Sequence, residues 1–290
     1  TENAPATARD REPLPAPAQL PPVLPDFAGR TDAFSDMRTL LTMSGRRAPT
    51  VVAIAGMGGI GKTSLALYTA HGVRDAYPDG QLYADLRGGD DTPAEPAIVL
   101  TGFLLSLGVA AEAVPDTRED RAKLFRSMLD GRRVLIVLDN ARDAAQVLDL
   151  MPGSVGCGVI VTGRSRLFGL PLTKQLGIDT FTPDEALSLL GTVIGHERLE
   201  AEREQALELL RLCGFLPLAI RIVAARLASR PRWSIATLTA RLANEQRRIE
   251  ELRVGGMSIH AVFELGYRQL PPQQARAFRL LAVPGSLDFG

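Results

Sequence analysis

An apolar run followed by a cluster of glycines is the feature that most limits how this chain can fold. The stretch VVAIAGMGGIGKTSLALYTA covers residues 51–70, and its first five residues are all apolar. A strand without alternating apolar and polar side chains is buried on both faces, as in a parallel sheet covered by helices. Four of the next six residues, 56–61, are glycine. Such a run predicts a loop that another group must approach closely.

The glycine cluster matches the phosphate-binding loop pattern G-x-x-x-x-G-K-[ST]. Residues 56–63 read GMGGIGKT, and a helical pattern begins near Lys62. Backbone N–H groups must wrap around a diphosphate, and the positive end of the helix dipole adds to them. We assign Lys62 to the β- and γ-phosphates and Thr63 to Mg²⁺. An ordinary glycine-rich turn is the alternative. The residues of this segment predicted to contact nucleotide are Gly56, Gly58, Gly59, Ile60, Gly61, Lys62, Thr63 and Ser64.

Strands and helices alternate from residue 50 to about residue 176. The second wholly apolar run is Val134–Leu138. This alternation predicts an α/β, doubly wound parallel sheet of the P-loop NTPase type, flanked by helices. The predicted strands are 50–55, 81–86, 132–139, 158–163 and 173–177, and the predicted helices between them are 62–77, 97–107, 118–129 and 144–150.

The remainder of the chain divides by composition and by periodicity. Residues 1–25 are rich in proline and alanine and predict an extended linker. The α/β domain is predicted over 26–178, and no strand is predicted after Thr180. A small helical domain is predicted over 179–255, with helices at the TPDEALSLL stretch, 199–212, 216–229 and 235–252. Two further amphipathic helices, 258–270 and 271–283, fall in the last segment, 256–290.

An acidic residue at the end of a buried strand completes the predicted metal site. Asp139 ends the run VLIVLD, at the carboxyl edge where open α/β sheets bind ligands. A strand-end aspartate that caps the next helix is the alternative. Asn140 follows, where many ATP hydrolases carry a second acid. An amide orients water without accepting its proton, so slow hydrolysis is predicted.

An arginine after another strand is the last candidate for the site. In VIVTGRSR, Thr162 and Arg164 follow a predicted strand and can face the same crevice, while Arg166 is a weaker candidate. A guanidinium there could contact the γ-phosphate and report whether it is present. The alternative is an arginine in a solvated loop.

The bulk properties exclude several classes of protein. Of the 290 residues, 46% are hydrophobic and 23% charged, and the formal net charge is zero, so no nucleic-acid or membrane partner is predicted. The two cysteines lack a histidine at metal-ligand spacing, so no zinc site is predicted, and reduced thiols fit a cytoplasmic location. No signal peptide is apparent. Both ends resemble cuts within a longer polypeptide.

Taken together, the motifs resemble a known family. GMGGIGKT, VLIVLDN, VIVTGRSR and CGFLPLAI occur in the order and spacing of the NB-ARC module of STAND signalling ATPases. The resemblance extends from about Phe27 to the end of the chain. The opening LPDFAGRTDAF and the closing segment are most similar to the central region of bacterial large SARP-type transcriptional activators, which regulate antibiotic production. The resemblance implies that 256–290 is the start of a truncated winged-helix domain.

The resemblance also implies roles for residues outside the glycine loop. Pro217 matches a proline that packs on adenine in the helical domain. Three positions depart from the family pattern: Ala33, where an acid is usual; Phe215, where a small residue is usual; and Asn140, which replaces the second acid. The motif implied to hold adenine and ribose comprises Phe27, Ala28, Gly29 and Arg30.

By this resemblance the expected function is an ATP/ADP-binding switch that hydrolyses ATP slowly. Bound ADP would clamp the α/β and helical domains together, and ATP would favour an open form that self-associates. The switch would control flanking DNA-binding and sensor domains of the same polypeptide. The alternative is a P-loop enzyme with a catalytic product, either a small-molecule kinase or a motor ATPase. The neutral helical segment lacks the cluster of Arg or Asp residues expected for a kinase lid. Direct DNA binding by this part is not expected.

Overall fold

A five-stranded parallel sheet forms the centre of the computed structural model. The structure describes residues 15–244, 251–255, 257–260, 264, 267 and 272–281. The strand order is β2-β3-β4-β1-β5, and every neighbouring pair is parallel. This arrangement confirms the α/β prediction. The strands are β1 Thr50–Ala55, β2 Gln81–Asp85, β3 Leu135–Ala141, β4 Gly158–Gly163 and β5 Lys174–Gly177.

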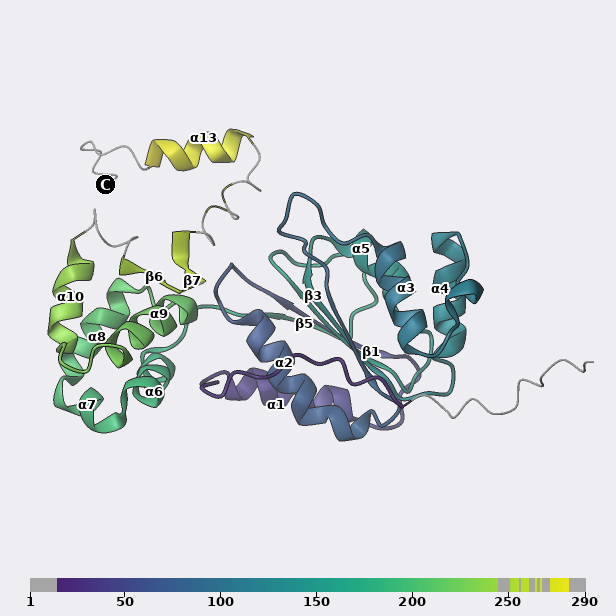
Figure 1. Ribbon diagram of the computed structural model, residues 1–290, viewed down its shortest axis with the longest axis horizontal. Helices are drawn as coiled ribbons and strands as arrows, with labels where there is room; N and C mark the ends of the chain where they lie inside the picture. Colours follow the sequence, from purple (N-terminus) through teal and green to yellow (C-terminus); the bar gives the residue numbers. More distant parts are fainter. Residues whose placement is uncertain are drawn as a thin grey trace, which may run out of the picture.

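Helices cover both faces of the sheet, as the unbroken apolar strands require (Figure 1). Alternate residues of β1 face opposite layers: Val52 and Ile54 belong to one core cluster, and Val51 and Ala53 to the other. The first cluster lies under α1 and α2, and the second under α3, α4 and α5. The bounds of these helices are α1 Thr31–Thr42, α2 Lys62–Val73, α3 Pro96–Ser106, α4 Arg118–Met128 and α5 Ala144–Val147, with single 3₁₀ turns at Arg74–Ala76, Ala111–Ala113 and Leu148–Leu150.

Part of the predicted linker packs against the α/β domain. Ala18 forms an isolated parallel bridge with Gln81, the first residue of the edge strand β2. The amide of Gln81 donates to the carbonyl of Pro17 at 2.6 Å, and the amide of Gln19 donates to the carbonyl of Gln81 at 3.0 Å. An edge strand exposes unpaired amides and carbonyls, and this segment satisfies some of them. Residues 15–24 thus lie in contact with the domain, whereas residues 1–14 lie outside the described part of the chain.

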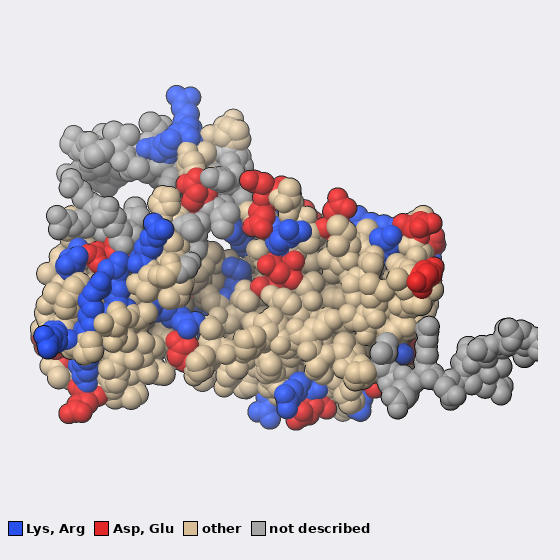
Figure 2. Space-filling view, in the orientation of Figure 1, with Lys and Arg blue, Asp and Glu red and all other residues tan. Residues whose placement is uncertain are grey.

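A bundle of helices follows the sheet and forms the other lobe in Figure 1. Its first helix starts at a capping box, in which Thr182 accepts from the amide of Glu185 and Glu185 accepts from the amide of Thr182. Helix α6 packs on α9, and α8 packs on α10. Lys and Arg side chains gather over this lobe in Figure 2. The helices are α6 Pro183–Ile194, α7 His196–Ala201, α8 Arg203–Leu212, α9 Pro217–Ala228 and α10 Ile235–Ala243.

The prediction of no strand after Thr180 is wrong. Strands β6 Arg253–Val254 and β7 Met257–Ser258 form an antiparallel pair. The predicted helix 235–252 is interrupted as well: α10 ends at Ala243, residues 245–250 lie outside the described part, and β6 begins at Arg253. The sequence did not predict β6 and β7 because a two-residue strand is too short to show an alternating pattern. Both strands contact α9, so long-range packing contributes to their formation.

The last segment is described only in part. Helix α13, Pro272–Leu281, agrees with the predicted helix 271–283. Of the predicted helix 258–270, Ser258 belongs to β7, and most of the rest lies outside the described residues. The winged-helix assignment therefore stays a prediction. Within the described part of the chain, no helix combines the length and the apolar composition needed to cross a lipid bilayer.

Candidate nucleotide-binding site

The glycine-rich loop joins the end of β1 to the start of α2, as its sequence pattern requires. Gly59 and Gly61 have φ angles of 74° and 94°, in the left-handed region that glycine adopts without strain. A Cβ on Gly56 would lie 2.8 Å from the carbonyl oxygen of Ile178. Gly61 is also the residue that precedes the first turn of α2. The loop thus presents backbone, not side chains, at the positive end of a helix, which is the arrangement that binds phosphate.

Lys62 folds back over this loop. Its Nζ donates to the carbonyl oxygens of Gly56 at 2.7 Å and Met57 at 2.8 Å. The pKa of Lys62 is lowered to about 8, chiefly by burial and also by the positive charge of Arg164, while Asp139 opposes the shift. The ammonium is therefore held at the mouth of the loop in surroundings that disfavour its charge. A phosphate placed there would relieve that cost.

Asp139 lies beside Thr63, although the two residues are 76 positions apart in the chain. The hydroxyl of Thr63 is 2.9 Å from both carboxylate oxygens of Asp139, whose exposed fraction is 6%. The hydroxyl of Thr162 donates to Oδ1 of Asp139 at 2.5 Å. A hydroxyl oxygen next to a buried carboxylate is the ligand chemistry that Mg²⁺ prefers, so Thr63 and Asp139 fit a magnesium ion. Such an ion would supply positive charge to the phosphate oxygens.

Tyr83 is a neighbour of Asp139 that the sequence pattern did not reveal. Its hydroxyl lies 3.4 Å from Oδ2 of Asp139. Burial raises the pKa of Tyr83, and the charges of Asp139 and Asp85 raise it further, so the phenol stays protonated. Strand pairing brings it there, because β2 lies next to β3 with Asp85 opposite Asp139. Nothing in the local sequence marks Tyr83 as part of a site.

Asn140 lies at an irregularity between β3 and β4. Leu138 pairs with Val161 and Ala141 with Gly163, so two residues of β3 face Thr162 alone. The amide of Asn140 donates to the hydroxyl of Thr162 at 2.8 Å, and its φ of 55° is left-handed. Asparagine adopts that conformation more readily than most residues. The backbone therefore supplies a reason for asparagine here beyond the chemistry of its side chain.

Arg164 follows β4 and lies over the loop after β2. A Cβ on Gly89 would lie 2.6 Å from Nη2 of Arg164, so the guanidinium covers that glycine closely. Burial lowers the pKa of Arg164, and the nearby carboxylate of Asp90 opposes the shift. Its charge also lowers the pKa of Lys62, and the two residues follow the carboxyl ends of the neighbouring parallel strands β4 and β1. A contact with the γ-phosphate remains a prediction.

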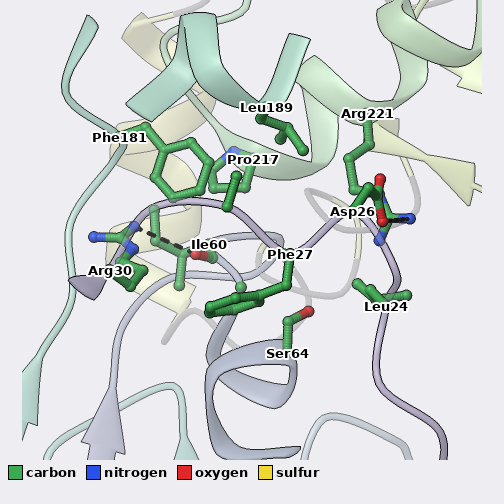
Figure 3. A pocket seen from close by; sticks show the side chains of 12 residues that line it. Leu24, Asp26, Phe27, Arg30, Ile60, Ser64, Phe181, Leu189, Pro217 and Arg221 are labelled. Carbon is green, nitrogen blue, oxygen red and sulfur yellow. Dashed lines mark hydrogen bonds and ion pairs between the residues drawn. The ribbon is translucent and has the colours of Figure 1, made fainter. Parts of the chain in front are cut away.

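A slot next to the loop is lined by residues from both lobes (Figure 3). Pro217, at the first turn of α9, and Phe181 lie on one side, and Phe27 and Ile60 lie on the other. The ring of Phe27 also stacks on Tyr68 with centroids 4.1 Å apart. The residues that line the slot are Leu24, Asp26, Phe27, Ala28, Arg30, Ile60, Gly61, Ser64, Phe181, Leu189, Pro217 and Arg221. A flat aromatic group such as adenine could pack its faces against walls of this composition.

Gly29 and Arg30 turn the chain into this slot. Both are left-handed, with φ angles of 72° and 60°. The amide of Arg30 donates to Oε1 of Glu185 at 2.7 Å, and its guanidinium donates to the carbonyl of Asp179 and lies 4.9 Å from the ring of Phe181. A Cβ on Gly29 would lie 2.8 Å from Oε1 of Glu185, which explains the glycine. Arg30 thus binds protein groups as well as lining the slot.

Several residues of the slot and its surroundings were not predicted from the sequence motifs. Glu185 does not line the slot but accepts from the amide of Arg30, which does; the capping-box pattern T-x-x-E marks Glu185, although its contact with Arg30 is long-range. Arg221 follows Pro217 by one helical turn, so spacing places both on one face of α9. Asp26, Phe181 and Leu189 carry no local signal.

A protein-family model and two curated relatives match this chain over much of its length. The NB-ARC domain model matches residues 35–200. The chain is 50% identical to "Regulatory protein AfsR" of Streptomyces coelicolor over 98% of its own length and 29% of that protein's. It is also 50% identical to the protein of that name from Streptomyces griseus, over 94% of this chain and 28% of that one. The chain therefore spans less than a third of these curated relatives.

A solved structure supports the fold alone. The crystal structure of Cdc6p from Pyrobaculum aerophilum matches with a TM-score of 0.51 and 17% sequence identity, over 78% of this chain and 68% of that chain. The parallel sheet, the phosphate-binding loop and the extent of the family match agree with one another. The chain belongs to the NB-ARC domain family.

Proposed function

We propose that this chain is an ATP/ADP-binding regulatory switch that hydrolyses ATP slowly. The observation that carries the proposal is the convergence of Lys62, Thr63 and Asp139 at a loop of backbone amides, next to a slot with apolar walls. The loop suits a diphosphate, the Thr63–Asp139 pair suits Mg²⁺, and the slot suits a base.

The position of the slot supports a switch rather than a simple binding site. Phe27 and Ile60 come from the α/β part, whereas Phe181, Leu189 and Pro217 come from the segment leading into the helical lobe and from that lobe. A nucleotide bound there would contact both parts. It would shift an open–closed equilibrium by its difference in affinity for the two forms. Lys62 and Arg164 are the groups proposed to read the γ-phosphate, which alone distinguishes ATP from ADP.

The regulatory role follows from the relatives. Two proteins named "Regulatory protein AfsR" share half of the aligned residues, and each is more than three times as long as the matched part. We propose that nucleotide state here controls flanking DNA-binding and sensor domains of a bacterial transcriptional regulator in the cytoplasm. Self-association in the ATP state belongs to the same proposal.

Slow hydrolysis is proposed from the residue after Asp139. Asn140 offers an amide where a base would accept a proton from the attacking water. A turnover below about 1 s⁻¹, at the low end for enzymes, is expected. Such a slow rate suits a regulatory switch that stays in its ATP-bound state for a limited time better than it suits a metabolic enzyme.

Mass analysis of nucleotide that co-purifies with the protein tests the proposal. Retained ADP is expected, together with binding of ADP and ATP in a calorimetric titration. Lys62→Ala is expected to weaken binding by about 100-fold, since a charge-assisted contact contributes about 1.5–3 kcal/mol. Lys123→Ala, at an exposed lysine of α4, is the matched control and is expected to bind normally. A folded wild-type protein that binds neither nucleotide contradicts the proposal.

A further inference from the structure

Arg221 of α9 lies where two hollows of the surface meet. One is the slot already described, which contains Phe27 and Pro217. The other opens at the phosphate-binding loop and is lined by Gly59, Gly61, Lys62, Thr63, Ser64, Pro217, Leu218 and Arg221. Arg221 lines both hollows. It is also the only basic side chain that does so in the described part of the chain.

The order of the chemical groups along a nucleotide indicates which of them would lie at that junction. The base occupies one end, and the β- and γ-phosphates occupy the other, at Lys62. Between them come the ribose and the α-phosphate. The hollows share Gly61 and Ser64 at the start of α2, next to the loop that takes the phosphates. A guanidinium placed there meets one charged group, the α-phosphate, and Arg is well suited to phosphate oxygens.

The guanidinium of Arg221 is held in place by an ion pair. Its Nη2 lies 2.9 Å from Oδ1 of Asp26, with 27% of the Arg221 side chain and 17% of the Asp26 side chain exposed. Arginine carries five N–H donors, and this ion pair engages Nη2 alone. Within the described residues Nε and Nη1 are not engaged by this pair, so both can donate to a phosphate while Asp26 is still bound. Figure 3 shows the pair at the edge of the slot opposite Arg30.

The helix that carries Arg221 also touches the loop directly. The amide of Leu218 donates to the carbonyl of Gly59 at 3.2 Å, and a Cβ on Gly59 would lie 3.1 Å from Cβ of Leu218. A phosphate bound by Arg221 would therefore join α9 to the loop across one short contact.

We propose that Arg221, oriented by Asp26, binds the α-phosphate of the nucleotide and ties the helical lobe to the phosphate-binding loop. This inference rests on the proposed nucleotide-binding function. Because ADP and ATP share the α-phosphate, Arg221 closes the two lobes on either nucleotide, and discrimination is left to the groups at the γ-phosphate. Asp26 acts as a positioning residue.

The test is calorimetric titration of Arg221→Gln with AMP, ADP, ATP and adenosine. We expect affinity for the three phosphorylated ligands to fall by the same factor, about tenfold or more for a lost charge-assisted contact. Adenosine affinity should not change. Arg221→Lys keeps the positive charge but lacks the planar guanidinium. Its affinities for AMP, ADP and ATP should lie between those of the wild type and those of Arg221→Gln. Arg211→Gln, at an exposed arginine of α8, controls for the lost charge and should leave all affinities unchanged.

A double-mutant cycle tests the role of Asp26. Asp26→Asn is expected to weaken ADP binding when Arg221 is present and to add nothing in Arg221→Gln. Equal losses in both backgrounds contradict the positioning role. Unchanged affinities in a folded Arg221→Gln, a loss for ATP alone, or an equal loss for adenosine each overturn the α-phosphate assignment. If the wild type binds no nucleotide, the proposed function has failed first, so the two failures are distinguishable.

Discussion

The carboxylate of Glu185 accepts a 2.7 Å hydrogen bond from the backbone amide of Arg30, a residue 155 positions earlier in the chain. Its other oxygen accepts from the amide of Thr182 at 2.9 Å and so caps α6. One side chain thus closes the first turn of the helical lobe and fixes the left-handed turn at Gly29 and Arg30. This shared carboxylate holds the turn at Gly29 and Arg30 against the start of α6, and so helps to set the shape of the slot.

Replacing Glu185 by glutamine is expected to lower the free energy of unfolding by about 1–2 kcal/mol, because an anionic acceptor of two backbone amides is lost. Urea denaturation of wild type and variant at pH 7 measures this. Asp184→Asn, in the same turn but exposed, is the control and should change little. Equal stability of Glu185→Gln and wild type would show that the shared carboxylate does not stabilise the fold.

The same contact predicts a pH dependence of stability. Burial acts to raise the pKa of Glu185, but hydrogen bonds from the amides of Arg30 and Thr182 outweigh it and lower the pKa below its usual 4.5. A lowered folded-state pKa contributes stability above the unfolded-state value, and this stability is lost as pH falls through the folded value. The stability difference between wild type and Glu185→Gln should therefore be full at pH 7 and shrink below pH 4.5.

Nucleotide affinity should fall in mildly alkaline solution. Burial, aided by Arg164, lowers the pKa of Lys62 to about 8. Bound phosphate favours the ammonium and raises this pKa, so binding takes up a proton above pH 8. ADP affinity should then decrease by up to about tenfold per pH unit, measurable by titration in buffers of different ionisation enthalpy. Lys62→Arg stays charged over this range and should show no such decrease. A wild-type affinity that is constant up to pH values well above 8 would contradict the lowered pKa.

Asp139 should carry the magnesium dependence of binding. Asp139→Asn keeps a partner for the hydroxyl of Thr63 but removes the charge that a divalent cation needs. ADP and ATP titrations with Mg²⁺ and with chelator are expected to differ in the wild type and to coincide in the variant. Asp91→Asn, at an exposed aspartate after β2, should retain the wild-type difference. A full magnesium effect in Asp139→Asn would remove this residue from the metal site.

Asn140 should limit hydrolysis. Aspartate tolerates the φ of 55° at this position, so Asn140→Asp should fold normally while it adds a base. Steady-state phosphate release is expected to rise about tenfold or more, within the range of general base catalysis. Asn140→Gly also tolerates this backbone conformation but adds no acid, so its rate of phosphate release should not rise. An unchanged rate in Asn140→Asp would place the limiting step elsewhere.

The local sequence determined the α/β core and the phosphate-binding loop. Apolar strands, helical periods and the GMGGIGKT pattern act over a few residues, so they predicted β1, α2 and the position of Lys62 and Thr63 at the start of α2 without any long-range contact. Most predicted bounds fall close to the observed ones, for example 97–107 against Pro96–Ser106. These elements follow from which faces must be buried.

Only the tertiary structure decided which distant residues share the site. Tyr83 reaches Asp139 through strand pairing, Asp26 meets Arg221 across 195 positions, and the β6–β7 pair forms against α9. The left-handed Asn140 likewise depends on its mismatch with β4. Such contacts depend on which surfaces meet once each element has formed. The periodicity of one helix or strand predicts which of its faces is buried, but it does not determine which other element packs against that face.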